Sequence, residues 1–156
     1  MIETMSPKVF FTKEQNEDII LAIKNAELDT SGEIRVHVEE KCPGDVLDRA
    51  SAIFKKLEIH KTELRNGVLF YLAIKNRKFA VIGDAGINKV VPENFWDDVR
   101  DILLNHFRDN KFTDGLVEGI TLAGHQLKKH FPFKKDDVNE LSDEISFGEN
   151  EKVNLQ

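Results

Sequence analysis

The fold is decided by residues 68–74, Val68-Leu69-Phe70-Tyr71-Leu72-Ala73-Ile74, which are apolar without interruption. A strand covered on both faces has this pattern, whereas a strand with one solvent face alternates apolar and polar side chains. The run is also far shorter than the ~20 residues that a membrane-spanning helix needs. It therefore predicts a central strand in a sheet that is covered on both faces.

The segments on either side of this run predict the rest of the sheet. Residues 79–82 are again apolar and follow a four-residue turn, which predicts an antiparallel hairpin with the central strand. Residues 33–39 alternate apolar and charged side chains, which is typical of an edge strand or of a sheet open on one face. A helix expected over residues 45–57 links this strand to the central one, so the two should be parallel. The sheet is therefore expected to be mixed.

Apolar residues at helical spacing predict three more helices, over residues 12–29, 92–107 and 113–131. Thr12 opens a capping box, Asp45 is a candidate cap for the crossover helix, and Thr113 is one for the last helix. Gly83-Asp84-Ala85-Gly86 is expected to interrupt the pattern without starting a helix. The fold class is α/β: a three-layer α/β/α sandwich with a small mixed sheet of three to four strands and about four helices.

The last helix carries a smooth ridge of small residues. Gly115, Gly119 and Ala123 fall four positions apart, and glycine inside a helix costs about 1 kcal/mol against alanine. We therefore expect this ridge to be in close contact with the sheet.

A length of 156 residues fits one domain with short extensions. Residues 1–11 are assigned to an N-terminal segment, 12–133 to the α/β domain and 134–156 to a tail. From 136 to 151 the chain has seven acidic residues and no basic ones, which predicts a mostly disordered tail. Leu141, Ile145 and Phe147 are the side chains through which this tail could dock.

The net charge of −6 argues against a nucleic-acid partner, because basic residues occur only in short runs such as Lys55-Lys56. A divalent cation or a basic protein partner suits this charge better. Cys42 is the single cysteine, so no internal disulfide forms, and a reducing compartment is favoured. No signal peptide or membrane-spanning run is visible. We expect a cytoplasmic monomer with no membrane insertion.

Motifs for self-sufficient catalysis are missing from the sequence. It contains no phosphate-binding loop, no dinucleotide glycine fingerprint and no paired-histidine zinc motif. Cys42 has no adjacent base and is interpreted as a bystander thiol. The histidines are dispersed and each is expected at the surface or rim, although His37 has charged neighbours.

One end of the predicted sheet gathers carboxylates from separate loops. The first two strands begin there and the third finishes there, which brings together Glu33, Glu63 and Asp84, with Glu93 just beyond. Converging carboxylates and loop carbonyls are the ligands that Ca²⁺ and Mg²⁺ prefer. The alternative is a salt-bridged loop cluster in which Arg65 neutralises Glu33 or Asp84.

The opposite end of the sheet offers a rival site. Glu39, Glu40 and Asp45 follow the carboxyl end of the first strand, where ligands of open α/β sheets commonly bind. The sequence does not separate these two ends.

An ordered set of segments, residues 31–36, 65–72 and 78–87 followed by Phe107 and residues 112–119, resembles a TPM domain over about residues 10–132. That family is named for a thylakoid lumen protein, a photosystem repair protein and a nematode receptor modulator. The resemblance implies a three-layer α/β/α sandwich, a phosphatase label and calcium binding at acidic loops. Where many members carry a Gly-Tyr-Gly turn after the third strand, this chain has residues 83–86, which place Asp84 in the turn.

Three functions follow as hypotheses. The first is a divalent-cation-binding module that uses some of Glu33, Glu63, Asp84 and Glu93. The second is a metal-assisted phosphomonoesterase, in which the cation polarises a phosphoryl oxygen and a carboxylate activates water. The third is a protein-interaction module, in complex assembly or repair, that uses the polar strand face or the acidic tail.

Overall fold

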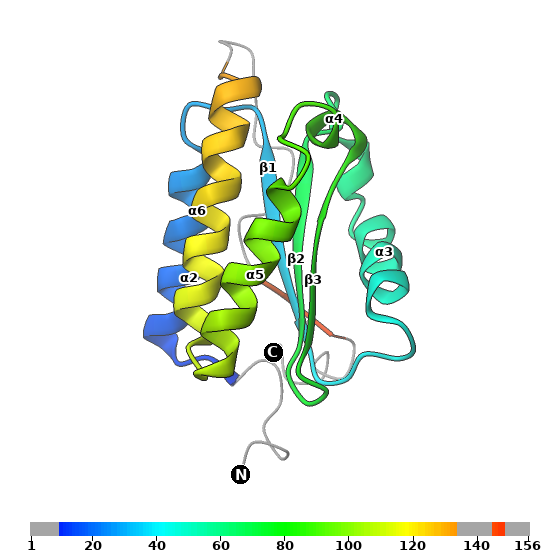
Figure 1. Ribbon diagram of the computed structural model, residues 1–156, viewed down its shortest axis with the longest axis vertical. Helices are drawn as coiled ribbons and strands as arrows, with labels where there is room; N and C mark the ends of the chain where they lie inside the picture. Colours follow the sequence, from blue (N-terminus) through cyan, green and yellow to red (C-terminus); the bar gives the residue numbers. More distant parts are fainter. Residues whose placement is uncertain (1–9, 134–144, 149–156) are drawn as a thin grey trace.

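The computed structural model describes residues 10–133 and 145–148. In these residues a four-stranded sheet has the order β3-β2-β1-β4 (Figure 1). β1 pairs in parallel with both β2 and β4, while β2 and β3 form an antiparallel hairpin. The strands are β1 (Glu33–Glu39), β2 (Gly67–Ala73), β3 (Lys78–Gly83) and β4 (Ser146–Phe147).

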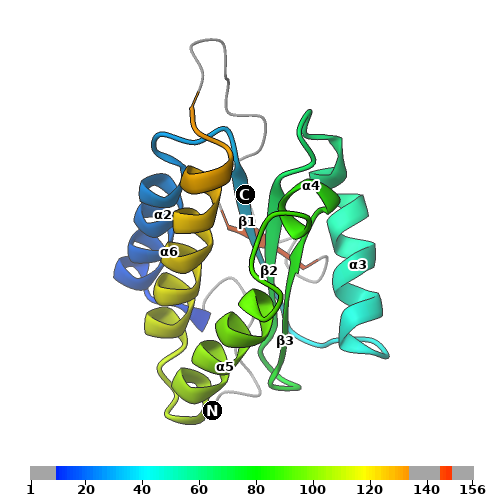
Figure 2. The same ribbon diagram turned by 45° about the horizontal axis from the view of Figure 1, so that its top comes forward.

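Helices cover both faces of the sheet. α2, α5 and α6 lie on one face and α3 on the other, which confirms the layered α/β fold with a mixed sheet (Figures 1 and 2). No helix within the described ranges is both long enough and apolar enough to cross a membrane. The helical elements are α2 (Lys13–Glu27), α3 (Val46–Lys56), η2 (Ile59–Lys61), α4 (Ala85–Asn88), α5 (Phe95–Arg108) and α6 (Phe112–His130).

β2 is buried along its whole length, as the uninterrupted apolar run predicts. Alternate side chains enter two separate cores. Phe70 and Leu72 belong to the larger core under α2, α5 and α6, whereas Leu69 and Tyr71 belong to the smaller core under α3. Both cores therefore depend on this one strand.

The expectation for β1 is wrong. β1 lies inside the sheet, between β2 and β4, and of its polar side chains only Arg35 is partly exposed. Glu33, His37 and Glu39 are only 3%, 4% and 5% exposed, so His37 is not a surface or rim residue either. An alternating pattern shows that one face of a strand is polar, but it does not show whether water or other polar groups of the protein satisfy that face.

Helix starts follow the predicted caps in part. Thr12 and Gln15 form both bonds of the capping box, and Asp45 caps α3 through the N–H groups of Leu47 and Asp48. Thr113 is not a cap, because α6 begins one residue before it and buries it.

The turn at residues 83–86 differs from its expectation. Asp84 caps a four-residue helix, α4, that begins immediately at Ala85. The physical reason is the carboxylate of Asp84, which accepts a hydrogen bond from the Ala85 N–H group.

Part of the predicted tail is ordered on the sheet. Ile145 is buried in the larger core and Phe147 packs against it, while His37 and Val38 of β1 pair with β4. The sequence left open whether the tail docks, and these two side chains do. Residues 134–144 and 149–156, with Leu141 among them, lie outside the described residues, so the prediction of disorder stays a prediction there.

The glycine ridge of α6 contacts α5 more than the sheet. A Cβ at Gly115 would meet His106 and Phe107 of α5. At Gly119 the ridge touches the sheet, where a Cβ would lie 3.1 Å from the ring of Phe70. The ridge is in close contact with its surroundings as expected, but it packs mainly against α5 rather than the sheet.

We predict that Gly86→Ala destabilises the protein by about 2 kcal/mol or more, through overpacking against backbone that cannot easily move. A Cβ there would lie 2.0 Å from the carbonyl oxygen of Leu64 and 2.6 Å from that of Arg65. Urea unfolding followed by Trp96 fluorescence measures the change. Gly44→Ala is the control, because its Cβ meets no atom within 4 Å and only its φ of +77° should cost about 1 kcal/mol. Equal stability of the Gly86 variant and the parent protein would contradict this reading.

Candidate functional site

Ser31, Glu33, Arg65, Asn66 and Asp84 meet where β1 and β2 begin, and we call them the amino-edge cluster. The ladder hydrogen bonds bring them together, since Glu33 pairs with Gly67 and the Asp84 N–H group donates to the Gly67 carbonyl at 2.9 Å. The backbone N–H group of Glu33 likewise reaches the carbonyl oxygen of Asn66 at 3.5 Å. The loops that precede β1 and β2 and the loop that follows β3 therefore meet at one end of the sheet, as the predicted topology requires.

Asp84 is held by Arg65 within this cluster. The guanidinium donates from Nε to Asp84 Oδ2 and from Nη2 to Oδ1, both at 2.7 Å. Asp84 is 5% exposed, whereas the Arg65 side chain is 51% exposed. The hydrogen bonds to Asp84 and the negative charge of Asp84 raise the pKa of Arg65 above its ordinary value. The structure thus contains the Arg65–Asp84 pairing of the salt-bridged alternative.

Asn66 contributes an oxygen atom that lacks a donor. The residue is 1% exposed, its side-chain amide donates to Ser31 Oγ at 3.2 Å, and its backbone N–H group donates to Thr62 Oγ1 at 3.2 Å. Among the described residues, no group donates a hydrogen bond to Asn66 Oδ1. A buried acceptor left unpaired costs on the order of 1–3 kcal/mol, so this atom requires an explanation.

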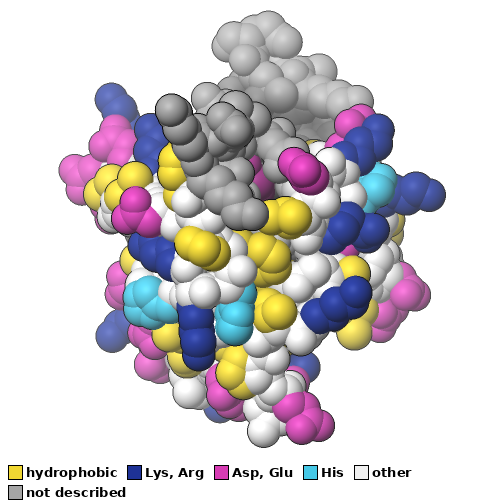
Figure 3. Space-filling model, turned by 90° about the horizontal axis from the view of Figure 1, so that it is seen from above, with side chains coloured by type: hydrophobic (Ala, Val, Ile, Leu, Met, Phe, Trp, Pro, Cys, Tyr) yellow, Lys and Arg dark blue, Asp and Glu magenta, His cyan; other side chains and the backbone are white. Residues whose placement is uncertain are grey.

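The four predicted carboxylates are placed differently from one another. Glu33 and Asp84 are buried at the amino edge, while Glu63 and Glu93 are exposed in the adjoining loops. In residues 10–133 and 145–148 there is no group of three or more His, Cys, Asp or Glu side chains arranged to hold a metal ion. Figure 3 views the molecule from this end and shows both acidic and basic side chains on it.

Sequence reasoning missed one carboxylate at this edge. Glu27, in the last turn of α2, accepts a hydrogen bond from the Ile34 N–H group at 2.8 Å. Helix spacing could not reveal this contact, because the turn between α2 and β1 decides where the side chain reaches.

The opposite end of the sheet carries a buried polar network built around Glu39. Arg49 of α3 donates two hydrogen bonds to its carboxylate, both at 2.8 Å, and the Tyr71 hydroxyl donates a third. His37 Nε2 lies 3.6 Å from Glu39 Oε1. On its other side, His37 Nδ1 lies 2.7 Å from Ser146 Oγ, so the network reaches β4.

These contacts decide the ionisation of Glu39. Burial alone would raise the pKa of its carboxyl, but the hydrogen bonds from Arg49 and Tyr71, the nearby imidazole of His37 and the charge of Arg49 outweigh burial and lower it from 4.5 to about 2. Hydrogen bonding to Glu39 in turn raises the pKa of Arg49, and burial together with Glu39 raises that of Tyr71. Glu39 is therefore an anion with its charge already compensated.

The three acidic residues of the rival site, Glu39, Glu40 and Asp45, have different structural roles. Asp45 is an exposed helix cap, and Glu39 belongs to the network just described. Glu40 and Cys42 line an open hollow of about 430 Å³, together with Lys41, Arg49 and Asn76. Cys42 is buried there, and its N–H group donates to Asn76 Oδ1.

Three members of the Glu39 network, Arg49, Tyr71 and Ser146, were not singled out by the sequence. Tyr71 lies directly opposite His37 in the parallel β1–β2 pair, so a correct strand register would have predicted that it is close to this network. Ser146 gave no such signal, because it joins the network only once the C-terminal segment has paired with β1.

Comparisons with known proteins agree with this architecture. A family model described as TPM domain matches residues 6–126. The solution structure of BA42 protein from the psychrophilic bacterium Bizionia argentinensis is 47% identical, with a TM-score of 0.82 over 89% of this chain and 96% of that one. The comparison with curated proteins gave no significant match.

Two more distant structures share the fold. The N-terminal domain of a P. gingivalis protein is 18% identical, with a TM-score of 0.67 over 81% of this chain and 83% of that one. The N-terminal domain of a Corynebacterium glutamicum protein is 12% identical, with a TM-score of 0.61 over 76% and 74%.

The Glu39 network predicts a specific loss of stability in acid. A carboxyl whose pKa is lower in the folded than in the unfolded state stabilises the fold above about pH 4.5, and this stabilisation disappears as pH falls towards 2. The contribution at neutral pH is roughly 3 kcal/mol. We expect Glu39→Gln to lower the free energy of unfolding at pH 7 and to flatten its decline between pH 5 and pH 2.

Urea unfolding at several pH values measures this effect. Glu58→Gln is the control, because Glu58 is exposed and pairs with exposed Lys61. A variant of Glu39 with the same acid-dependent decline as the parent protein would show that this network does not control acid stability.

Proposed function

This chain belongs to the TPM domain family, and we propose that it is a module that binds one divalent cation, Ca²⁺ or Mg²⁺, at the amino-edge cluster. The observation that carries the proposal is Asn66 Oδ1, a buried oxygen with no donor among the described residues. A bound cation would explain this atom, because Ca²⁺ and Mg²⁺ take side-chain amide oxygens as ligands and so replace the missing hydrogen-bond donor.

The neighbours of Asn66 supply further oxygen atoms. Ser31 Oγ is in contact with the same amide group, and Glu33 is joined to Asn66 through the backbone at the edge of the sheet. One carboxylate, one amide oxygen and one hydroxyl are suitable hard ligands, and water completes the shell of most Ca²⁺ and Mg²⁺ sites. Glu63 and Glu93, exposed in the adjoining loops, are proposed as outer ligands.

Arg65 and the cation compete for Asp84 in this proposal. Both oxygens of Asp84 accept hydrogen bonds from the guanidinium, so Asp84 joins the ion only when Arg65 moves away. The Arg65 side chain is half exposed, and its movement into solvent requires no rearrangement of the core. Affinity should therefore be modest, and removal of Arg65 should increase it.

Calcium and magnesium titrations followed by amide NMR shifts and calorimetry test this site. We expect saturable shifts confined to residues near 31–33, 63–66 and 83–93. Glu33→Gln and Asn66→Ala should each raise the Kd at least tenfold, which corresponds to about 1.4 kcal/mol. Asp84→Asn, which keeps the acceptor for the Ala85 N–H group, should also weaken binding, whereas Arg65→Gln should strengthen it.

Glu118→Gln is the matched control, because Glu118 is exposed on α6 and pairs with His106. Unchanged affinity in the Glu33 and Asn66 variants would contradict the amino-edge site. Shifts confined to residues 39–45 would move the ion to the rival end of the sheet.

The same samples test hydrolysis. In the phosphomonoesterase alternative, the bound cation polarises a phosphoryl oxygen and Glu33 activates water. Turnover of an aryl phosphate that needs added Ca²⁺ or Mg²⁺ and is lost in Glu33→Gln would support this activity. Cation binding without turnover would leave a binding module.

A further inference from the structure

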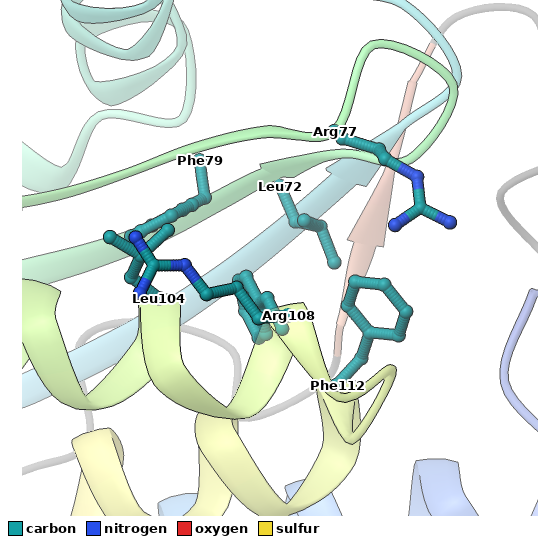
Figure 4. Close-up of a pocket in the computed structure, with 7 residues that line it drawn as sticks. Leu72, Arg77, Phe79, Leu104, Arg108 and Phe112 are labelled. Carbon is teal, nitrogen blue, oxygen red and sulfur yellow. The ribbon is translucent and has the colours of Figure 1, made fainter.

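A second concave site lies at the opposite end of the sheet, between the β2–β3 hairpin and the corner where α5 meets α6 (Figure 4). Its volume is about 160 Å³. The floor is apolar and comes from four elements, namely β2, β3, α5 and α6. The floor residues are Leu72, Phe79, Leu104, Phe107 and Phe112.

Aromatic contacts hold this floor in shape. The ring of Phe107 packs edge-on against Phe79 with 5.0 Å between centroids, and it lies at the same distance from Phe112. Phe107 is buried in the larger core, so the floor is anchored to it. Leu104, by contrast, is 36% exposed, although the hydrophobic side of α5 faces the core. The hollow is therefore preformed and open to solvent.

Arg77 from the hairpin and Arg108 from the end of α5 flank the apolar floor (Figure 4). Both side chains are exposed, and among the described residues neither forms an ion pair with a carboxylate. Arg77 has one long contact, from Nη2 to Asn110 Oδ1 at 3.5 Å. The cationic charge of Arg108 is favourable in the last turn of a helix, but this does not account for Arg77.

Local charge at this end is opposite to that of the whole chain. The two segments that bound the hollow, residues 75–78 and 108–111, contain Lys75, Arg77, Lys78, Arg108 and Lys111 against the single acidic residue Asp109. The chain as a whole has a net charge of −6. An anionic partner is therefore favoured beside these two segments, whose charge is opposite to the net charge of the chain.

We propose that this arginine-flanked hollow binds an acidic segment of a partner protein by enclosing one bulky apolar side chain between Arg77 and Arg108. The volume supports a side-chain anchor, because sites for small organic ligands usually enclose about 300–1,000 Å³. Apolar anchors in preformed pockets with arginine at the rim are typical of interface hot spots. The two guanidinium groups bind carboxylates on either side of the anchor through charge-assisted hydrogen bonds.

This inference does not depend on the proposed cation site. The hollow lies at the carboxyl end of β2, whereas the amino-edge cluster lies where β1 and β2 begin. Failure of either proposal therefore leaves the other intact.

The test uses the full chain and a synthetic probe, acetyl-Glu-Glu-Phe-Glu-Glu-amide. We expect saturable amide shifts around residues 72, 77–79 and 104–112. Replacement of the Phe of the probe by Ala, or of all its Glu residues by Gln, should raise the Kd about tenfold. The double variant Arg77→Gln/Arg108→Gln should cause a similar loss.

Arg100→Gln is the matched control, because Arg100 is an exposed arginine of the same helix and pairs with Asp97. Its Kd should change less than twofold, and the variant spectra should show an intact fold. Three outcomes overturn the proposal: no saturation with the parent protein, equal binding of the Gln probe, or shifts at another surface. Tighter binding of hexanoate at the same residues would assign the hollow to a small amphipathic carboxylate and also overturn it.

Discussion

The structure depends on burying β2 on both faces while both of its edges are paired. Apolar side chains of this strand enter the two cores alternately, so the helices on each face are held against the same backbone. Because no water reaches the strand, its N–H and C=O groups need partners in the protein. β1 and β3 supply them, and β1 pairs through its other edge with β4.

The interior position of β1 buries part of its polar face. Buried polar side chains require hydrogen-bond partners. At one end of the sheet, Arg49 and Tyr71 donate to Glu39, and Ser146 contacts His37. The outcome is a polar network that fastens α3 and β4 to the sheet. Such a network is worth more when it is complete than when one member is missing, because each remaining group would be buried without a partner.

The two ends of the sheet have different chemistry. At the amino edge, the buried oxygen Asn66 Oδ1 has no donor among the residues that the structure describes. Beside the β2–β3 hairpin, exposed cationic groups outnumber acidic ones around an apolar floor. An unpaired oxygen acceptor suits a cation, and a hollow flanked by two guanidinium groups suits an anion, so the two proposals require ligands of opposite charge.

The sequence by itself determined the mixed sheet, the central strand, the hairpin, the parallel crossover and the helix caps at Thr12 and Asp45, because local periodicity and cap chemistry specify them. It also predicted that Glu33, Arg65 and Asp84 would meet, since strand direction alone brings their loops together. Only tertiary structure decided that β4 pairs with β1, that His37 is buried and that Arg65 holds Asp84. Those outcomes depend on contacts between residues distant in sequence, and no local pattern records which partner a polar side chain meets.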